Sequence, residues 1–319
     1  MSIESYNNML KEIKDKIENE KLKYKNAIII GDNSSGKSEL LRNILMDKKE
    51  GYYFIDSVNR SFNYEKIGDI QKISNTYINV LKHRLEENIF NLNDSFDFNK
   101  TGIGFIEEVY LNFEEELKML IKDFLNVDFD IAIEDNLILG KKQKLLIDKN
   151  VEKLSSGYQA IIRIFLELLY FKNSYNNINK NPIVVIDEIN EFLSTKNEKK
   201  FLPFLMKKFN NMNFIITTHS ADVIASSIDF NIIVLKGNSY ECLDGNDFST
   251  VTDAREIFEK IYKLSDNNMA NDIEFELRNL LNFKISGTWT EKEETKLNKI
   301  EKEKLTNSQL LILNEIKSW

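Results

Sequence analysis

The sequence predicts an α/β fold, in which helices cover a mostly parallel β-sheet, with an inserted helical arm and a helical region at the carboxyl end. Short apolar runs, the pattern of buried strands, recur at residues 27–30, 52–55, 183–186, 214–217 and 231–235. Helical patterns separate these runs, which is typical of parallel strands joined by crossover helices. The chain has 319 residues, of which 42% are hydrophobic, and this is enough to bury a core.

The pattern divides the chain into three regions, at residues 1–25, 26–250 and 251–319. The first region predicts an amphipathic helix that either packs on its own domain or forms a seam between copies of the chain. Its apolar residues recur at steps of three and four: Ile3, Tyr6, Leu10, Ile13 and Ile17. The second region is the α/β domain, and the third is predicted to consist of charged helices.

A helical insert is expected at about residues 60–135 of the α/β domain. Residues 104–125 carry apolar side chains at helical spacing and predict one long helix. Residues 127–147 alternate apolar and polar side chains, which predicts a hairpin. The insert has no long heptad array, so it is expected to be a compact arm.

Composition excludes several classes of protein. The chain carries 43 Lys and Arg against 51 Asp and Glu, a net charge of -8, which argues against a protein that coats nucleic acid. One cysteine and two histidines cannot form a disulfide within the chain and argue against a zinc site. Cys242 follows an apolar run and is expected to be a packed thiol. No apolar run approaches the ~20 residues that cross a bilayer, so we expect a cytoplasmic protein without a membrane partner.

Residues 31–38 read GDNSSGKS, a phosphate-binding pattern between an apolar strand and a helix. Gly31 and Gly36 let successive backbone N–H groups face one point, where the amino end of the helix also favours negative charge. Lys37 is expected to bind the β- and γ-phosphates, and Ser38 a Mg²⁺ ion. The predicted nucleotide contacts are Gly31, Asp32, Asn33, Ser34, Ser35, Gly36, Lys37, Ser38 and Glu39.

Two carboxylates, Asp187 and Glu188, directly follow the apolar strand at residues 183–186. Carboxylates at the carboxyl edge of a parallel sheet face the ligand crevice. We therefore expect Asp187 to share the Mg²⁺ site with Ser38, and Glu188 to orient the attacking water. Positioning and charge stabilisation account for most of the catalysis of phosphoryl transfer, so such a pair suits that reaction.

Two further segments indicate a function only when their order along the chain is considered together with the phosphate loop and the acidic pair. Residues 154–160 read LSSGYQA before an apolar helix, where the serines alone indicate a plain helix cap. Residues 217–220 read TTHS after a strand, where a lone histidine also suits a structural role. A phosphate loop, a serine-rich helix start, a strand with Asp-Glu and a strand with histidine occur in that order.

This order resembles ABC-type ATPases of the P-loop NTPase class, closer to the soluble SMC, RecF and OLD-like group than to transporters, over residues 26–237. The resemblance implies ATP and Mg²⁺ as cofactors, Lys37 and Glu188 as catalytic residues, and His219 as the switch histidine. It also implies a homodimer or higher oligomer, in which one copy caps the nucleotide bound by another. The capping residues would be Ser155, Ser156 and Gly157.

The sequence departs from the family pattern in two places. No glutamine follows the strand at residues 52–55 until Gln71, so Asn59 and Arg60 are the candidates to replace the family's glutamine loop. The hairpin that often provides an aromatic residue for the adenine is shortened or replaced by the first helix. This leaves Tyr24 as a weak candidate for that contact.

Within the family, the chain looks like the small standalone ATPases of anti-phage defence, the PtuA-like ATPases. That likeness implies a sensor or regulatory subunit that works with a separate effector, either a nuclease or a toxin. A second prediction is a DNA repair or maintenance ATPase that clamps nucleic acid, with Lys141, Lys142 and Lys144 as a basic patch. A third is the nucleotide-binding subunit of a transporter, against which the missing glutamine loop counts.

Overall fold

The computed structural model describes residues 3–32, 35–46, 48, 50–58, 60–68, 77–87, 89–92, 96, 105–136, 140–175, 181–248, 250–255, 257–258, 276–277, 280–281, 284, 289–303, 305 and 307–318. Its contacts divide the chain into two compact units, residues 1–258 and 259–319. The sequence instead predicts a boundary at residue 250. Among the described helices, none is both long and apolar enough to cross a membrane.

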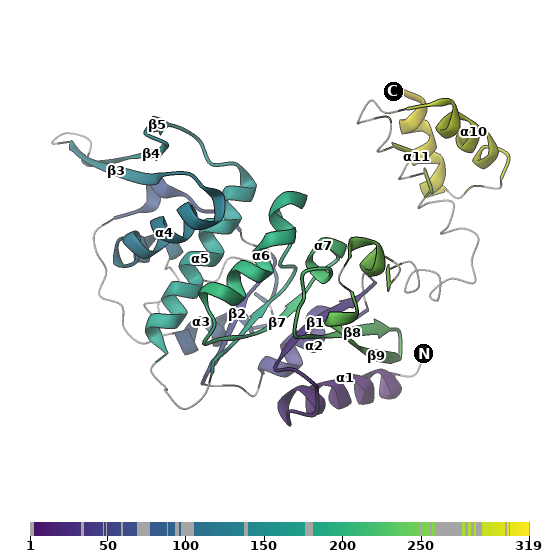
Figure 1. Cartoon of the computed structure of the whole chain (residues 1–319), viewed down its shortest axis with the longest axis horizontal. Helices are drawn as coiled ribbons and strands as arrows, with labels where there is room; N and C mark the ends of the chain where they lie inside the picture. Colours follow the sequence, from purple (N-terminus) through teal and green to yellow (C-terminus); the bar gives the residue numbers. More distant parts are fainter. Residues whose placement is uncertain are drawn as a thin grey trace. The chain divides into compact units, whose positions relative to one another are not determined.

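A six-stranded sheet forms the centre of the first unit (Figure 1). Its strands are β1 (Asn26–Gly31), β2 (Tyr52–Ile55), β6 (Ile183–Ile186), β7 (Asn213–Thr217), β8 (Phe230–Lys236) and β9 (Ser239–Asp244). They lie in the order β2-β6-β7-β1-β8-β9, and only the last pairing is antiparallel. In the register of the sheet, Ile28 of β1 lies between Ile216 of β7 and Ile232 of β8. The predicted α/β fold with a mostly parallel sheet is confirmed.

Helices cover both faces of this sheet (Figure 1). On one face, α1 (Ile3–Glu18) and α2 (Lys37–Leu45) pack against alternate strand residues. On the other face lie α5 (Ser156–Ser174) and α6 (Thr195–Lys208), and the ring of Phe171 in α5 stacks on Tyr53 of β2 at 4.9 Å. Because both faces are covered, β1, β2, β6, β7 and β8 are almost wholly apolar and buried.

The described part of residues 60–151, which includes the predicted insert at 60–135 and the hairpin that follows it, contains short helices and a small sheet. Its elements are η1 (Tyr64–Lys66), α3 (Tyr77–Arg84), η2 (Ile106–Asn112), α4 (Glu114–Leu125), β3 (Phe129–Asn136), β4 (Gly140–Ile147) and β5 (Asn150–Val151). Strands β3, β4 and β5 form a three-stranded antiparallel sheet, which contains the predicted hairpin. The long helix expected at residues 104–125 is wrong, because it is broken at Phe113. Three glutamates begin α4 there, and negative charge stabilises a helix amino end.

Smaller described elements of the first unit include α7 (Ala221–Ile224) and η3 (Gly245–Asp247). Strand β9 was not predicted, because it is a partly exposed edge strand without an apolar run. It exposes Cys242, so the expectation of a packed thiol is wrong. In the second unit, α10 (Glu291–Ile300) and α11 (Asn307–Ser318) enclose an apolar cluster, and Thr290 caps α10 in a capping box with Glu293.

Candidate functional site

The phosphate-binding loop follows β1 and ends where α2 begins. Gly36 has a φ of 93°, a left-handed conformation that favours glycine, and a Cβ there would overlap the hydroxyl of Tyr6. At the other end of the loop, a Cβ on Gly31 would lie 2.5 Å from Ser35 Oγ. Asn33 and Ser34, two of the predicted contacts, lie outside the described residues. Of the two, Gly36 is the position whose backbone conformation itself favours glycine.

Lys37 is the buried cation of the loop. Its Nζ donates hydrogen bonds to the carbonyl oxygens of Gly31 and Asp32, both at 3.1 Å. Burial lowers the pKa of Lys37, and the negative charges of Glu188 and Asp187 oppose this shift. The side chain thus folds back over the loop, toward the two carboxylates that end β6.

Asp187 receives four hydrogen bonds from distant parts of the chain. Ser38 Oγ donates to its Oδ2 at 2.9 Å, and Asn91 Nδ2 donates to the same oxygen at 2.6 Å. Thr217 Oγ1, at the end of β7, donates to Oδ1, and the backbone carbonyl accepts from Arg60 Nη2 at 2.7 Å. Strands β6 and β7 end side by side with the phosphate loop, which is why these groups converge.

Glu188 and His219 form the outer part of the site. Glu188 Oε1 lies 3.2 Å from His219 Nε2, and both side chains are partly exposed. The backbone of Glu188 is left-handed, with a φ of 50°, an uncommon conformation for glutamate. Its N–H donates to Thr217 Oγ1 at 2.7 Å. The structure thus places Lys37, Ser38, Asp187, Glu188 and His219, all predicted, around the ends of β1, β6 and β7.

Three residues of this site were not predicted for the roles their contacts show. Thr217 was quoted only as part of TTHS, and Arg60 only as a substitute for a glutamine. Asn91, in the insert, was not singled out, and its left-handed backbone (φ 53°) directs an amide toward Asp187. Asn59, the other substitute considered, lies outside the described residues. No local pattern marks Asn91, since only the tertiary fold brings it to β6.

The serine-rich segment begins α5. Ser155 is the N-cap, and its Oγ accepts a hydrogen bond from the backbone N–H of Tyr158 at 3.3 Å. Ser155 and Ser156 are exposed, whereas Gly157 is half-buried, with a Cβ there meeting the carbonyl oxygen of Phe192 at 2.9 Å. No described hydrogen bond joins these residues to the phosphate loop of the same chain. Their surface remains open to another molecule.

The residues present fit a Mg²⁺-nucleotide. Ser38 and Asp187 provide the hydroxyl and carboxylate oxygens that Mg²⁺ prefers, and their contact shows that both face one point. Ser35 Oγ is buried without a hydrogen-bond partner among the described residues, and it lies in the curl of the loop. Lys37 adds positive charge, as a triphosphate requires.

Other predicted contacts lie elsewhere. Tyr24 donates to Asp244 and precedes the start of β1, at the opposite edge of the sheet from the phosphate loop. Among the three hairpin lysines, Lys144 pairs with Glu134 at 2.7 Å, so its charge is balanced. Lys142 is exposed, and the side chain of Lys141 lies outside the described set.

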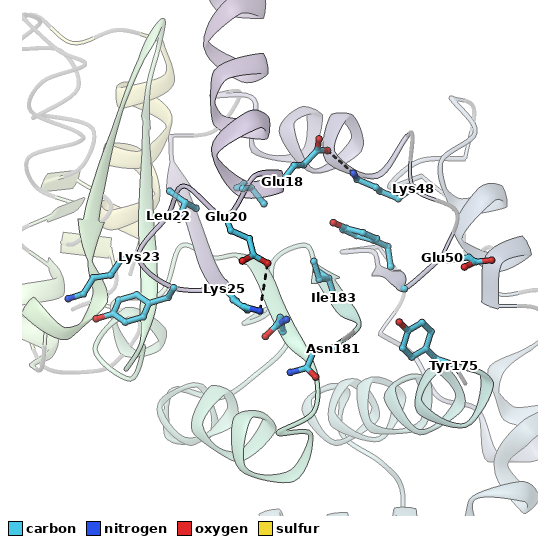
Figure 2. Close-up of a pocket in the computed structure, with 15 residues that line it drawn as sticks. Glu18, Glu20, Leu22, Lys23, Lys25, Lys48, Glu50, Tyr175, Asn181 and Ile183 are labelled. Carbon is cyan, nitrogen blue, oxygen red and sulfur yellow. Dashed lines mark ion pairs between the residues drawn. The ribbon is translucent and has the colours of Figure 1, made fainter. Parts of the chain in front are cut away.

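A pocket of about 750 Å³ opens at this opposite, amino edge of the sheet (Figure 2). It is lined by the residues that begin β2 and β7 and by charged side chains that pair with one another. Lys48 lies 3.1 Å from Glu18, and Lys25 lies 3.7 Å from Glu20. The predicted catalytic residues are not among those that line it.

Comparison with known proteins gives two curated relatives. The chain is 35% identical over 102 residues to the retron Ec83 probable ATPase of Escherichia coli, covering 29% of this chain and 19% of that protein. It is 26% identical over 225 residues to the Septu protein PtuA of Bacillus mycoides (strain KBAB4), covering 64% of this chain and 29% of that protein. The chain thus resembles these two proteins and spans less than a third of the length of either. No family model matches.

Solved structures give weaker similarities. The SMC head domain from Thermotoga maritima is 17% identical, with a TM-score of 0.32, covering 44% of this chain and 49% of that one. An SMC ATPase studied for ATP-driven dimerization is 14% identical, with a TM-score of 0.35, covering 50% of this chain and 98% of that one.

Proposed function

We propose that the protein binds ATP and hydrolyses it with Mg²⁺, as an ABC-type ATPase. One observation carries the proposal: the hydroxyl of Ser38 and the carboxylate of Asp187, 149 residues apart in sequence, lie 2.9 Å apart beside the buried Lys37. Such a constellation has little structural reason to form without a ligand, since it gathers charges that water would otherwise solvate.

The chain's residues divide the work of phosphoryl transfer. Lys37 and the N–H groups at the start of α2 bind phosphate oxygens. When the nucleotide binds, Lys37 exchanges its hydrogen bonds to the carbonyl oxygens of Gly31 and Asp32 for hydrogen bonds to phosphate. Ser38 and Asp187 would hold Mg²⁺, which neutralises phosphate charge when bound. Asn91 and Thr217 orient the Asp187 carboxylate through their hydrogen bonds.

Glu188 is the residue that orients the attacking water, and His219 is the residue that contacts the transferred phosphate. Their side chains lie 3.2 Å apart at the exposed mouth of the site, where water has access. Phosphoryl transfer depends on positioning and on charge stabilisation, so a glutamate held by a fixed backbone suits this task.

The complete site is proposed to form between two copies of the chain. The resemblance to ABC-type ATPases implies that the exposed Ser155 and Ser156, with Gly157, cap the nucleotide held by the partner's phosphate loop. ATP binding would then close a head-to-tail homodimer, and hydrolysis would open it.

The retron and Septu relatives support a role in anti-phage defence. We infer that this chain is a sensor or regulatory ATPase that acts on a separate effector polypeptide, a nuclease or a toxin. The inference rests on the names of the relatives and on the resemblance, and the effector is identified only by experiment.

The Glu188→Gln variant tests the proposal. It keeps the size and hydrogen bonding of the side chain but removes its charge, so ATP should bind and remain unhydrolysed. Light scattering at saturating ATP and Mg²⁺ should show dimers of this variant. A Lys37→Ala, Glu188→Gln double variant is the control and should stay monomeric.

A Glu188→Gln protein that is monomeric with ATP would contradict the dimer, and one that binds no ATP would contradict the ATPase assignment. Affinity purification of the same variant from native cells identifies the partner. A co-purified nuclease or toxin supports the defence role, and nucleic acid alone would instead support a DNA maintenance ATPase.

A further inference from the structure

The peptide unit that joins Asp187 to Glu188 is held from both sides. Its carbonyl oxygen accepts a hydrogen bond from Arg60 Nη2 at 2.7 Å, and its N–H donates to Thr217 Oγ1 at 2.7 Å. Arg60 comes from the loop after β2 and Thr217 from the end of β7, so β6 ends between two fixed partners. A peptide plane with both of its polar groups bonded cannot rotate without breaking one of them.

This plane sets the backbone of Glu188. Glu188 has a φ of 50°, a left-handed conformation that is unfavourable for a residue with a side chain. Such a conformation persists only where surrounding contacts impose it. With the peptide held, the carboxylate of Asp187 faces Ser38 and that of Glu188 faces His219. One peptide orientation therefore aims two acidic side chains at two different partners.

Arg60 is in turn held through its neighbours by α5. Ser61 accepts a hydrogen bond from Arg163 Nη1 at 3.4 Å, and the N–H of Phe62 donates to Gln159 Oε1 at 3.2 Å. Arg163 and Gln159 both belong to α5, the helix that begins with the exposed serines. The segment of residues 60–62 thus connects α5 to the peptide between the two carboxylates.

We propose that Arg60 is a positioning residue of the site: by holding the Asp187–Glu188 peptide it aims both carboxylates at their partners. The catalytic meaning of this proposal rests on the proposed function, but the structural claim about the peptide does not. Arg60 is 2% exposed and lies too deep for a surface role.

Arg163 provides a matched control. Like Arg60 it is a buried arginine, 1% exposed, and its Nε donates to Glu167 at 2.7 Å. Its described hydrogen bonds go to Glu167 and to the carbonyl oxygen of Ser61. Losing Arg163 removes a partner of a buried carboxylate and should lower stability strongly. Losing Arg60 removes a buried cation and should lower stability less, while it frees the peptide. The two variants should separate stability from positioning.

The first experiment needs no nucleotide. Hydrogen exchange of the Glu188 amide is compared among wild type, Arg60→Met, Arg60→Lys and Arg163→Met, each checked for folding by thermal melting. We expect Arg60→Met to exchange at least about tenfold faster than wild type at this amide, because the peptide can then open locally. In Arg60→Lys the exchange rate of this amide should lie between those of wild type and Arg60→Met, because lysine keeps a hydrogen-bond donor. Arg163→Met should melt at a lower temperature but exchange more slowly at Glu188 than Arg60→Met.

The second experiment separates kcat from KM. Arg60→Met should lower kcat about tenfold or more and raise KM for ATP by a smaller factor, because Lys37 still binds phosphate while the aim of both carboxylates is loosened. Arg60→Lys should recover part of the loss, and Arg163→Met should lose less. Unchanged exchange at Glu188 in Arg60→Met, or equal losses of kcat in both arginine variants, would overturn the proposal. A wild type without ATPase activity would refute the proposed function alone, because the exchange result still decides whether Arg60 holds the peptide.

Discussion

The two edges of the central sheet differ in what their polar residues do. At the carboxyl edge, side chains from α2, the insert, β6 and β7 converge on Asp187, and their hydrogen bonds span up to 149 residues of sequence. At the amino edge, a pocket of about 750 Å³ is lined by lysines and glutamates that pair with one another (Figure 2). At the carboxyl edge, hydrogen bonds converge on one carboxylate. At the amino edge, ion pairs surround a pocket.

The difference teaches that the pocket at the amino edge and the proposed nucleotide site are separate, because the converging groups lie at the other edge. Exposed ion pairs such as Lys25–Glu20 contribute little to stability, and they engage several of the charged groups that line this pocket. At the carboxyl edge, by contrast, Lys37 is buried against carbonyl oxygens that a phosphate can replace. The following comparisons set one residue of each edge against another.

The largest effect is expected from lysines. Lys37→Ala should lower the rate of ATP hydrolysis by at least about a hundredfold. Removing one pre-positioned donor that stabilises charge in the transition state typically costs this much. Lys48→Ala, at the amino edge, should leave hydrolysis unchanged, since Lys48 is paired with Glu18. Phosphate release at saturating ATP measures both. Equal losses in the two variants would end the distinction between the edges.

A buried glutamate of α5 and an exposed glutamate of the amino edge should differ next most. Glu167 is buried with Arg84 and Arg163; burial raises its pKa, but both arginines outweigh this and lower it to about 2 from an ordinary value of 4.5. A carboxylate with a lowered pKa stabilises the fold above the unfolded value, and the contribution is lost as the pH falls from 4.5 toward 2. Glu167→Gln should lose about 3 kcal/mol at pH 7.

Urea unfolding at pH 7 and at pH 3 checks this expectation. The difference in unfolding free energy between wild type and Glu167→Gln should shrink at pH 3, because the pH then approaches the pKa of Glu167. Glu20→Gln, whose carboxylate is exposed at the amino edge, should change stability by less than about 1 kcal/mol at either pH. A gap between wild type and Glu167→Gln that is the same at both pH values would show that the buried charge is not the cause.

Glycines at the two edges offer a third comparison. Gly36 and Gly51 both have a positive φ, 93° and 76°, so alanine should cost about 1 kcal/mol of backbone strain at each. At Gly36 the added Cβ also overlaps the hydroxyl of Tyr6, whereas at Gly51 the nearest atom, in Tyr175, is 3.3 Å away. Gly36→Ala should therefore weaken ATP binding about tenfold, and Gly51→Ala should not. Calorimetric titration with ATP decides between them.

The sequence predicts the carboxyl edge well where chemistry is local. The phosphate loop needs two glycines, a lysine and a serine within eight residues, and the carboxylates follow a strand directly, so the motifs themselves indicate the site. The alternation of apolar runs and helices likewise predicts the parallel sheet, since buried strands must be apolar on both faces.

The sequence fails where a residue acts through tertiary contact. Asn91 reaches Asp187 from the insert, and nothing in its neighbourhood marks it. Arg60 is predicted only as a replacement for a glutamine, and its contact with the backbone carbonyl of Asp187 is not visible in the sequence. Cys242 is exposed because β9 is an edge strand whose pattern is mixed. Pairing partners and edges are properties of the folded sheet and not of a window of sequence.

The smallest effect should come from two tyrosines. The hydroxyl of Tyr6 lies beside Gly36 and donates to Glu39 at 3.1 Å. Burial, and secondly the contact with Glu39, raise the pKa of Tyr6 to about 12. Tyr24 donates to Asp244 at 3.1 Å at the amino edge. Tyr6→Phe removes the hydrogen bond to Glu39, and Tyr24→Phe removes those with Asp244 and Asn246. A hydrogen bond to a carboxylate is worth about 1.5 kcal/mol. Only Tyr6→Phe releases a carboxylate next to the phosphate loop, where its charge repels a triphosphate. It should weaken ATP binding about two- to fivefold, whereas Tyr24→Phe leaves the affinity unchanged. The affinity of a fluorescent ATP analogue measures both, and a wild-type affinity in Tyr6→Phe would place Tyr6 outside the nucleotide site.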